Sequence, residues 1–315
     1  MNPVQVRIDP WAPEFGTAMA GADDLTPTAG DVNLNLEVPT DEWAPLSPGP
    51  DATARNDVVF VDGVRRIDAR VWVTAADGTT THGVCASWAA GTVRCNGTAT
   101  IERCQVERGL FASVEVPSMH TRAATYAFRP AASDDGEALV QAVQECMRDL
   151  EGEVSREAGE ADLLIVDGPL RGRQGLPNAV GYIKTHRVSY LPPLVSDVVP
   201  ALAAGQRTPI FMTQTTWRRA SWYLRLPGQE GHPWAGVVRC EASADTPLDE
   251  LRRLADTTAL ALPRFASTAH KDPRAPQNLF PIAGLERQLK HRLGDATLLY
   301  RHLRAAAAGL LTTRG

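Results

Sequence analysis

The sequence predicts an α/β (α+β, mixed-sheet) fold, in which helices flank one mixed sheet. Short apolar runs rich in Val, Ile and Leu recur along residues 58–116 and are typical of strands. A long pattern of helical period follows them, and another apolar strand pattern comes directly after it. The chain has 315 residues, which is enough for one large domain or two small ones.

The composition excludes several classes of protein. No apolar stretch approaches the roughly 18 residues that span a bilayer, and the N-terminus lacks the basic and apolar regions of a secretory signal. We therefore expect a cytoplasmic protein without a membrane segment. The five cysteines never have the two-residue spacing of a zinc knuckle, which argues against a structural zinc site. Because the net charge is −5, a DNA substrate would need a local basic groove or a partner protein.

Residues 1–52 are predicted to form an extended, irregular N-terminal arm. They contain eight prolines, separated by Gly, Asp and Thr, and show little periodic pattern. Trp11 and Trp43 are expected to hold this arm against the main body. Residues 53–315 are expected to form the main domain.

The first part of the main domain is predicted to be an antiparallel meander. Turn signals separate strand patterns at residues 58–61, 67–74, 83–90 and 110–116. A helix follows, with Asp134 and Glu137 as a capping box and Gly159 just past its end. Its apolar residues form one stripe, so it is expected to pack on the sheet.

The remaining elements follow in order. A strand at residues 162–167 leads into the glycine-rich loop GPLRGRQGLP, which lacks the GxxxxGK[ST] spacing of a phosphate-binding loop. Further strands are expected at residues 180–188, 209–213, 221–226 and 236–240. Helices are expected at residues 248–261, 282–293 and 297–311.

Two aspartate–glycine steps end apolar runs, at Asp62-Gly63 and at Asp167-Gly168. Glycine allows the backbone to turn sharply where each carboxylate leaves the sheet. Two strands that bring carboxylates to one sheet edge predict a site for a divalent metal. Asp-Gly is also a common strand-ending turn, and this simpler interpretation holds for either step alone.

The order of three strands, a helix and an Asp-tipped strand is that of an RNase H-like core. In that fold, as the resemblance implies, the first strand, the first helix and the fourth strand each supply a carboxylate. Asp62 and Asp167 match the strand positions. On the helix, Glu145 points roughly 150° from the apolar stripe, whereas Glu151 lies about 90° from it and flanks the buried face. Glu151 is therefore preferred, with Glu153 and Glu115 as alternatives.

Three clustered carboxylates are unfavourable without a cation. Acidic groups about 4 Å apart repel each other by roughly 4 kcal/mol at an effective dielectric constant of 20. Mn²⁺ or Mg²⁺ relieves this repulsion, and two such ions can activate water and stabilise the leaving oxygen in phosphodiester hydrolysis. In the alternative interpretation, Asp62 caps a turn and Glu151 is a solvated helix residue.

The sequence resembles the NurA nuclease family over residues 58–295. The resemblance depends on ordered short motifs: FVDGVRR, LLIVDGPL, VGYIKTH, WYLRL, VVRCE and QNLFPIAGLERQL. It implies a manganese-dependent exo- or endonuclease that processes DNA ends, works as a homodimer with a HerA-like hexameric ATPase, and serves DNA repair or anti-phage defence. In this family the core is RNase H-like.

The resemblance also implies site residues. Asp62, Glu151 and Asp167 match the catalytic, metal-binding acids. Lys184, Arg225 and Arg239 match basic positions of the family and are expected to contact DNA, although each could equally be a surface charge or an ion-pair partner. Apart from the resemblance, Arg171 and Arg173 are expected to line a central groove of the homodimer with Lys184. The family's Tyr and His near the C-terminus are not matched, because Phe280 precedes Pro281 and LERQL has no His in register. His270, or else His291, is the expected substitute.

Two other functions remain open. The missing Tyr and His favour a catalytically weak DNA-binding or scaffolding partner of a motor ATPase. A third interpretation is a phosphotransferase that binds a nucleotide at GPLRGRQG. A partner ATPase is expected to dock on the N-terminal arm or on the C-terminal helix with Leu298, Leu299 and Leu303, whose apolar side also fits an ordinary core.

Overall fold

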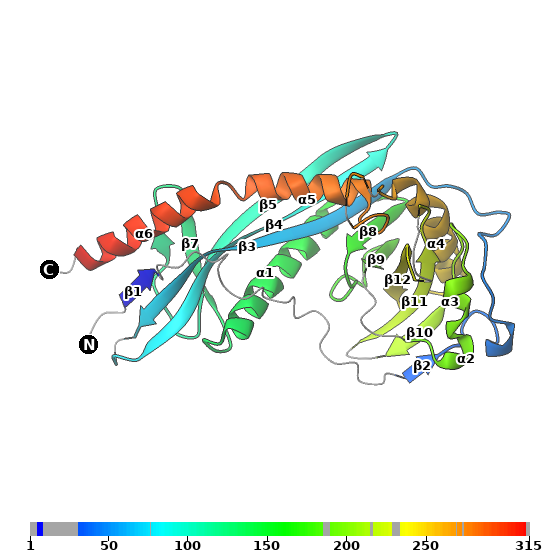
Figure 1. The fold of residues 1–315 in the computed structure, drawn as a ribbon, viewed down its shortest axis with the longest axis horizontal. Helices are drawn as coiled ribbons and strands as arrows, with labels where there is room; N and C mark the ends of the chain where they lie inside the picture. The colour runs from blue at the N-terminus through cyan, green and yellow to red at the C-terminus, as the bar shows by residue number, and fades with distance from the viewer. Residues whose placement is uncertain are drawn as a thin grey trace.

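The computed structural model describes residues 5–8, 31–75, 77–184, 190–214, 217–228, 234–268, 270–272 and 274–312. Within these residues the chain forms one large mixed sheet with helices packed on its faces (Figure 1). The predicted α/β class is therefore confirmed.

Three long strands form the predicted antiparallel meander, namely β3 (Val58–Thr74), β4 (Thr80–Asn96) and β5 (Thr98–Ala112). The prediction of separate strands at 58–61 and 67–74 is wrong, because β3 continues through Asp62 and Gly63. These residues pair with Gly91 and Ala90 of β4, so the backbone stays extended instead of turning. The first half of β5 is largely exposed and polar, which explains why its apolar pattern begins only near residue 110.

Helix α1 (Gly136–Glu157) follows and leads into β8 (Leu163–Asp167), which pairs with β3 in parallel. Strand β9 (Ala179–Ile183) pairs with β8, also in parallel. The central order is therefore β5-β4-β3-β8-β9. The predicted chain order of strands, then a helix, then an Asp-tipped strand is therefore present, with α1 as the connection to β8.

Short strands extend the sheet at both edges. Beyond β9 lie β12 (Val237–Ser243), β11 (Arg218–Arg225), β10 (Phe211–Gln214) and β2 (Asp31–Asn33). Beyond β5 lie β7 (Thr125–Pro130) and β6 (Met119–His120), and β1 (Gln5–Ile8) pairs with the far end of β3. Within the described residues the sheet has 12 strands. The sequence does not predict β6 and β7, which lack a sustained apolar alternation.

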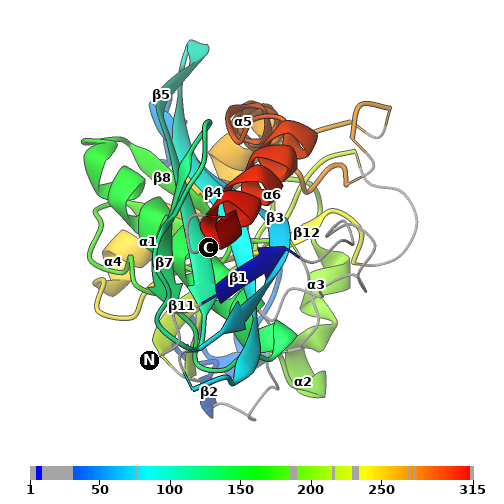
Figure 2. The same ribbon diagram turned by 90° about the vertical axis from the view of Figure 1, so that its left-hand side faces the viewer.

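The helices confirm most sequence predictions. Asp135 caps α1, one residue later than predicted, and Gly159 past its end has a φ of 70°. The C-terminal helices are α4 (Leu248–Ala261), α5 (Phe280–Arg292) and α6 (Ala296–Thr312). Helices α5 and α6 lie end to end along the long strands (Figures 1 and 2). Four shorter helical segments were not predicted: η3 (Thr40–Glu42), α2 (Pro193–Ser196), α3 (Val198–Ala201) and η4 (Leu262–Phe265).

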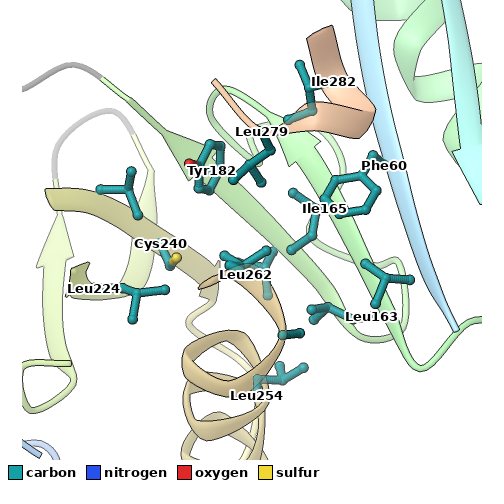
Figure 3. Packing of buried hydrophobic residues seen from close by; sticks show 14 of the residues in the cluster. Phe60, Leu163, Ile165, Tyr182, Leu224, Cys240, Leu254, Leu262, Leu279 and Ile282 are labelled. Atoms are coloured by element: carbon teal, nitrogen blue, oxygen red, sulfur yellow. The ribbon is translucent and has the colours of Figure 1, made fainter. Parts of the chain in front are cut away.

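Alternate residues of β3 enter two different hydrophobic cores. Val59 and Val61 pack with α1, whereas Val58 and Phe60 pack with α4 and α5. Figure 3 shows Phe60 in the second core, beside residues of β8 and α5. Because successive strand residues point to opposite faces, α1 and α5 cover opposite faces of the sheet.

The N-terminal arm contacts the sheet where the structure describes it. The ring of Trp43 lies 6.1 Å from that of Phe211 on β10, as predicted for Trp43. Trp11 lies outside the described residues. Among the helices that the structure describes, none is long and apolar enough to cross a membrane.

Candidate active site

Asp62 and Asp167 lie next to each other on two parallel strands. Val61 of β3 is in register with Val166 of β8, and each aspartate is the next residue of its strand. Asp62 is in phase with Phe60, and Asp167 is in phase with Ile165. Both carboxylates therefore leave the sheet on the face that α5 covers. The structure thus brings together the two aspartates that the sequence singles out.

Burial makes this pair electrostatically unfavourable. Burial, and then repulsion from Asp167, raises the pKa of Asp62 well above its ordinary value. Burial also raises the pKa of Asp167, although Lys184 opposes this shift. The amide of Gly63 donates to Oδ1 of Asp62 at 2.8 Å. A nearby cation would therefore stabilise the ionised form of the two carboxyl groups.

Lys184 is that cation in this structure. Its Nζ lies 2.6 Å from Oδ2 of Asp167 and 3.1 Å from Oδ1 of Asn278. The side chain of Asn278 donates to Asp272 at 2.6 Å, and Arg274 contacts Asp272 at 3.3 Å. A continuous polar network therefore runs from Asp167 into the segment before α5.

This network continues onto α5. Arg274 donates to Glu286 at 2.8 Å, and Lys290 donates to the same carboxylate at 2.7 Å. In addition to burial, the negative charge of Glu286 raises the pKa of Asp167. Sequence reasoning missed both Asn278 and Glu286. Both residues belong to the QNLFPIAGLERQL motif, so the motif itself is the signal that could have found them.

Glu151 approaches from the opposite face of the sheet. It is the buried glutamate of α1, a helix that the structure describes in full, whereas Glu145 and Glu153 are exposed. Its Oε2 lies 3.0 Å from Nη1 of Arg173, and both side chains are about 5% exposed. Burial raises the pKa of Glu151 to about 7, against the opposing effect of Arg173. The helical position chosen from the sequence is therefore a buried ion pair.

Gly63 has a different role from the one predicted. A Cβ at this position would overlap the carboxylate of Glu151. The glycine is thus needed for close approach of α1 to β3, and the predicted turn after Asp62 is wrong. The second step does turn, because Gly168 has a φ of 106° at the end of β8.

The three acids influence one another without forming a closed cluster. Glu151 contributes to the raised pKa of Asp62, and Asp167 contributes to that of Glu151. Among the described residues, however, no group of three His, Cys, Asp or Glu side chains could hold a metal ion. The carboxylates of Asp167 and Glu151 face Lys184 and Arg173 instead. Glu115 lies beyond the end of β5 and is exposed.

Three of the five predicted DNA-contacting residues are buried. Arg225 donates to the carbonyl oxygens of Ala235, Val199 and Pro200 at 2.8–3.1 Å. Arg239 lies beside Glu241, and its guanidinium is 4.4 Å from the ring centre of Tyr190. With Arg173 on Glu151, these side chains hold the interior together and are not placed to meet DNA. Arg171 is exposed, and Lys184 is 22% exposed.

The predicted histidine substitutes are at the surface. His270 is exposed in a turn, and His291 is exposed in the last turn of α5. Among the described residues, neither ring makes a hydrogen bond or ion pair with the three acids. The ring of Phe280 is 39% exposed and lies 5.2 Å from Nζ of Lys271.

Two other features lie outside the acidic site. The glycine-rich loop uses its own amides, since Leu170 donates to Glu241 at 2.8 Å and Arg173 to the carbonyl of Leu170 at 2.9 Å. This arrangement does not favour a nucleotide there. A cavity of about 480 Å³ lies between the tip of β4–β5 and the start of α5, and none of the three acids lines it.

The chain matches no protein-family model, and no curated protein sequence is significantly similar to it.

Proposed function

We propose that this protein is a divalent-metal-dependent deoxyribonuclease. The observation that carries the proposal is the pair formed by Asp62, which is buried, and Asp167, whose side chain is 13% exposed, on adjacent parallel strands of an RNase H-like sheet. Burial raises the pKa of both carboxyl groups, and the charge of Asp167 raises that of Asp62 further, so the pair favours a bound cation. The sequence resemblance to the NurA family supports the same function.

The donor set suits Mn²⁺ or Mg²⁺, because both metals prefer carboxylate oxygens. Asp62 and Asp167 are the residues that would hold the ion. When bound, such an ion lowers the pKa of water and stabilises the leaving oxygen of a phosphodiester. Glu151 fits less well, since Arg173 holds its carboxylate. A second ion would need this glutamate.

The chain's own residues supply orientation and charge. Lys184 keeps Asp167 oriented and favours its ionised form, and Asn278 fixes the ammonium group from the other side. Arg173 does the same for Glu151. Phe280 has no hydroxyl group to donate, so we assign no proton transfer to this position.

The proposed substrate is DNA, and the proposed assembly is a homodimer docked on a HerA-like hexameric ATPase in the cytoplasm. The net charge of −5 supports a partner, because an acidic chain attracts a polyanion weakly on its own. Leu299 and Leu303 of α6 belong to the core, whereas Leu298 is 49% exposed. A docking surface on α6 is therefore limited to its outer side. DNA-end repair and defence against foreign DNA are the processes that such an assembly serves.

The test is cleavage of linear and circular DNA with Mn²⁺, with Mg²⁺ and with EDTA, by the wild-type protein and by Asp62→Asn and Asp167→Asn variants. We expect metal-dependent cleavage by the wild type and none by either variant with retained circular dichroism. Adding the ATPase should stimulate the wild type alone. A folded Asp167→Asn protein that cleaves at the wild-type rate would refute the site.

A catalytically weak DNA-binding or scaffolding subunit is the second candidate. The observation that favours it is that Lys184 and Arg173 neutralise two of the three acids. It predicts no cleavage with either metal, but DNA binding and stimulation of the partner's ATPase activity. Measuring both activities with the same preparation separates the two candidates.

A further inference from the structure

Helices α5 and α6 carry exposed basic residues in a chain that is acidic overall. Residues 280–312 contain five Arg or Lys and two Asp or Glu, whereas the whole chain has a net charge of −5. All five cations are exposed. We call them the basic stripe: Arg287, Lys290, Arg292, Arg301 and Arg304.

Most of the stripe is not neutralised. Lys290 pairs with Glu286, but the four arginines have no ion-pair partner among the described residues. By contrast, arginines elsewhere in the chain, such as Arg94 and Arg207, are each held by two carboxylates. The positive charge of the stripe is therefore largely uncompensated by nearby carboxylates.

The basic side chains of α5 and α6 lie on the sides of these helices that face away from the sheet. Ile282, Leu285 and Leu289 of α5 are buried against the sheet, and Leu299 and Leu303 of α6 are buried likewise. Arg287 and Lys290 lie three residues apart, as do Arg301 and Arg304, so each pair shares one side of its helix. From Arg287 to Arg304 the two end-to-end helices of Figure 1 extend roughly 25 Å at 1.5 Å per residue.

The stripe begins where the acidic site ends. The network from Asp167 through Lys184, Asn278 and Arg274 reaches Glu286, and Lys290 contacts that same carboxylate. The aspartate pair and α5 also share one face of the sheet. A long polyanion bound along the stripe would thus reach the aspartates at one end.

We propose that the basic stripe binds the phosphate backbone of duplex DNA and leads it to Asp62 and Asp167. The proposal rests on the proposed function for its purpose, but binding itself requires no cleavage. The helical span of about 25 Å from Arg287 to Arg304 matches about seven base pairs of a rod that carries one charge per ~1.7 Å. Because the whole chain is acidic, the positive charge of the stripe would favour DNA on this side.

The test is fluorescence anisotropy with a labelled duplex of about two helical turns, in EDTA, so that no cleavage occurs. The variant Arg287→Glu/Arg301→Glu changes one arginine on each helix. Its matched control is Arg218→Glu/Arg253→Glu, which makes the same change of charge at exposed positions on β11 and α4. Affinity is measured between about 50 and 200 mM salt.

We expect the stripe variant to bind DNA at least about tenfold more weakly than the wild type. The slope of log K against log salt should become shallower by about 2, since two phosphate contacts are lost. The control should bind as the wild type does. Equal binding by all three proteins, or equal loss in both variants, would overturn the assignment. Equal binding by all three proteins would instead indicate that the stripe binds an acidic protein surface.

Parallel cleavage assays of the wild type with Mn²⁺ keep the two proposals apart. If the stripe variant loses DNA binding but the wild type does not cleave, DNA binding by the basic stripe is supported and the nuclease function is rejected. If the wild type cleaves DNA but the stripe variant binds it as well as the wild type does, DNA binding by the basic stripe is rejected and the nuclease function is retained.

Discussion

The carboxylate of Glu151 fills the space that a side chain at residue 63 would occupy. Helix α1 can therefore approach β3 at this point only because Gly63 has no Cβ. The contact links the helical acid to the residue next to Asp62, across the sheet from the aspartate pair.

Replacing Gly63 with Ala should displace Glu151 and weaken its bond to Arg173. We expect a loss of about 2 kcal/mol in the free energy of unfolding, as for other overpacked sites. Gly284→Ala in α5 is the matched control, because a Cβ there meets nothing within 4 Å. That change should stabilise the helix by ~0.5–1 kcal/mol. Urea unfolding measures both, and similar effects would contradict the close approach.

The two aspartates should respond differently to removal of their charge in metal-free buffer. Asp62→Asn removes a buried, repelled carboxylate, so its Tm should exceed that of the wild type. The gain should be larger at pH 8 than at pH 4, because the repulsion requires ionised acids. Asp167→Asn takes the carboxylate partner from Lys184 and should cost about 1–3 kcal/mol. Calorimetry in EDTA tests this, and Asp62→Asn below the wild type at pH 8 would contradict it.

The raised pKa of Glu151 predicts a specific pH dependence of stability. The folded protein holds this proton up to about pH 7, whereas the unfolded chain releases it near pH 4.5. The contribution of Glu151 is therefore full below pH 4.5 and is lost as the pH rises towards 7. The Glu151→Gln variant should lack this decline, and urea titrations across the window measure it. A parallel decline in both proteins would assign the proton to another group.

Activity should depend on Glu151 far more than on Glu145. Glu145 is exposed and accepts a hydrogen bond from Gln141 on the same helix. We expect Glu151→Gln to lower metal-dependent cleavage by at least about tenfold, a loss of roughly 1.4 kcal/mol in transition-state stabilisation. Glu145→Gln should cleave as the wild type does. Small and equal effects would confine the site to the two aspartates.

Arg225 should matter for stability and not for DNA. Arg225→Ala leaves three carbonyl oxygens without their donor, and we expect a loss of about 2–4 kcal/mol. Arg171→Ala changes an exposed side chain and should alter stability by less than about 0.5 kcal/mol. Thermal unfolding ranks the two. A stable Arg225→Ala protein with weakened DNA binding would restore the sequence-based assignment.

Local patterns were sufficient for much of the fold. The bounds of α4 match its predicted range, and the end of α1 at Gly159 follows from glycine's access to positive φ. The apolar runs that end at Asp62 and Asp167 also located the aspartate pair correctly. These features depend on neighbours in sequence, which a pattern can register.

The errors at the candidate site depend on partners distant in sequence. Nothing near Gly63 distinguishes a glycine that turns from one that makes room for Glu151. Similarly, Arg173 and Arg225 have the composition of surface residues, and only the folded chain brings them Glu151 and the carbonyl oxygens that allow burial. The sequence also could not show that Glu151 reaches the site from the face opposite the aspartates.

The unbroken course of β3 ties the acidic site mechanically to the far end of the molecule. Asp62 and Val71 belong to one strand, and Val71 pairs with Ile8 of β1. About 30 Å of extended backbone joins them, with β4 alongside and a single register shift near Ile67. On either side of that shift the pairing with β4 is continuous. A displacement of the N-terminal strand would therefore be transmitted along β3 towards Asp62 without any contact at the site.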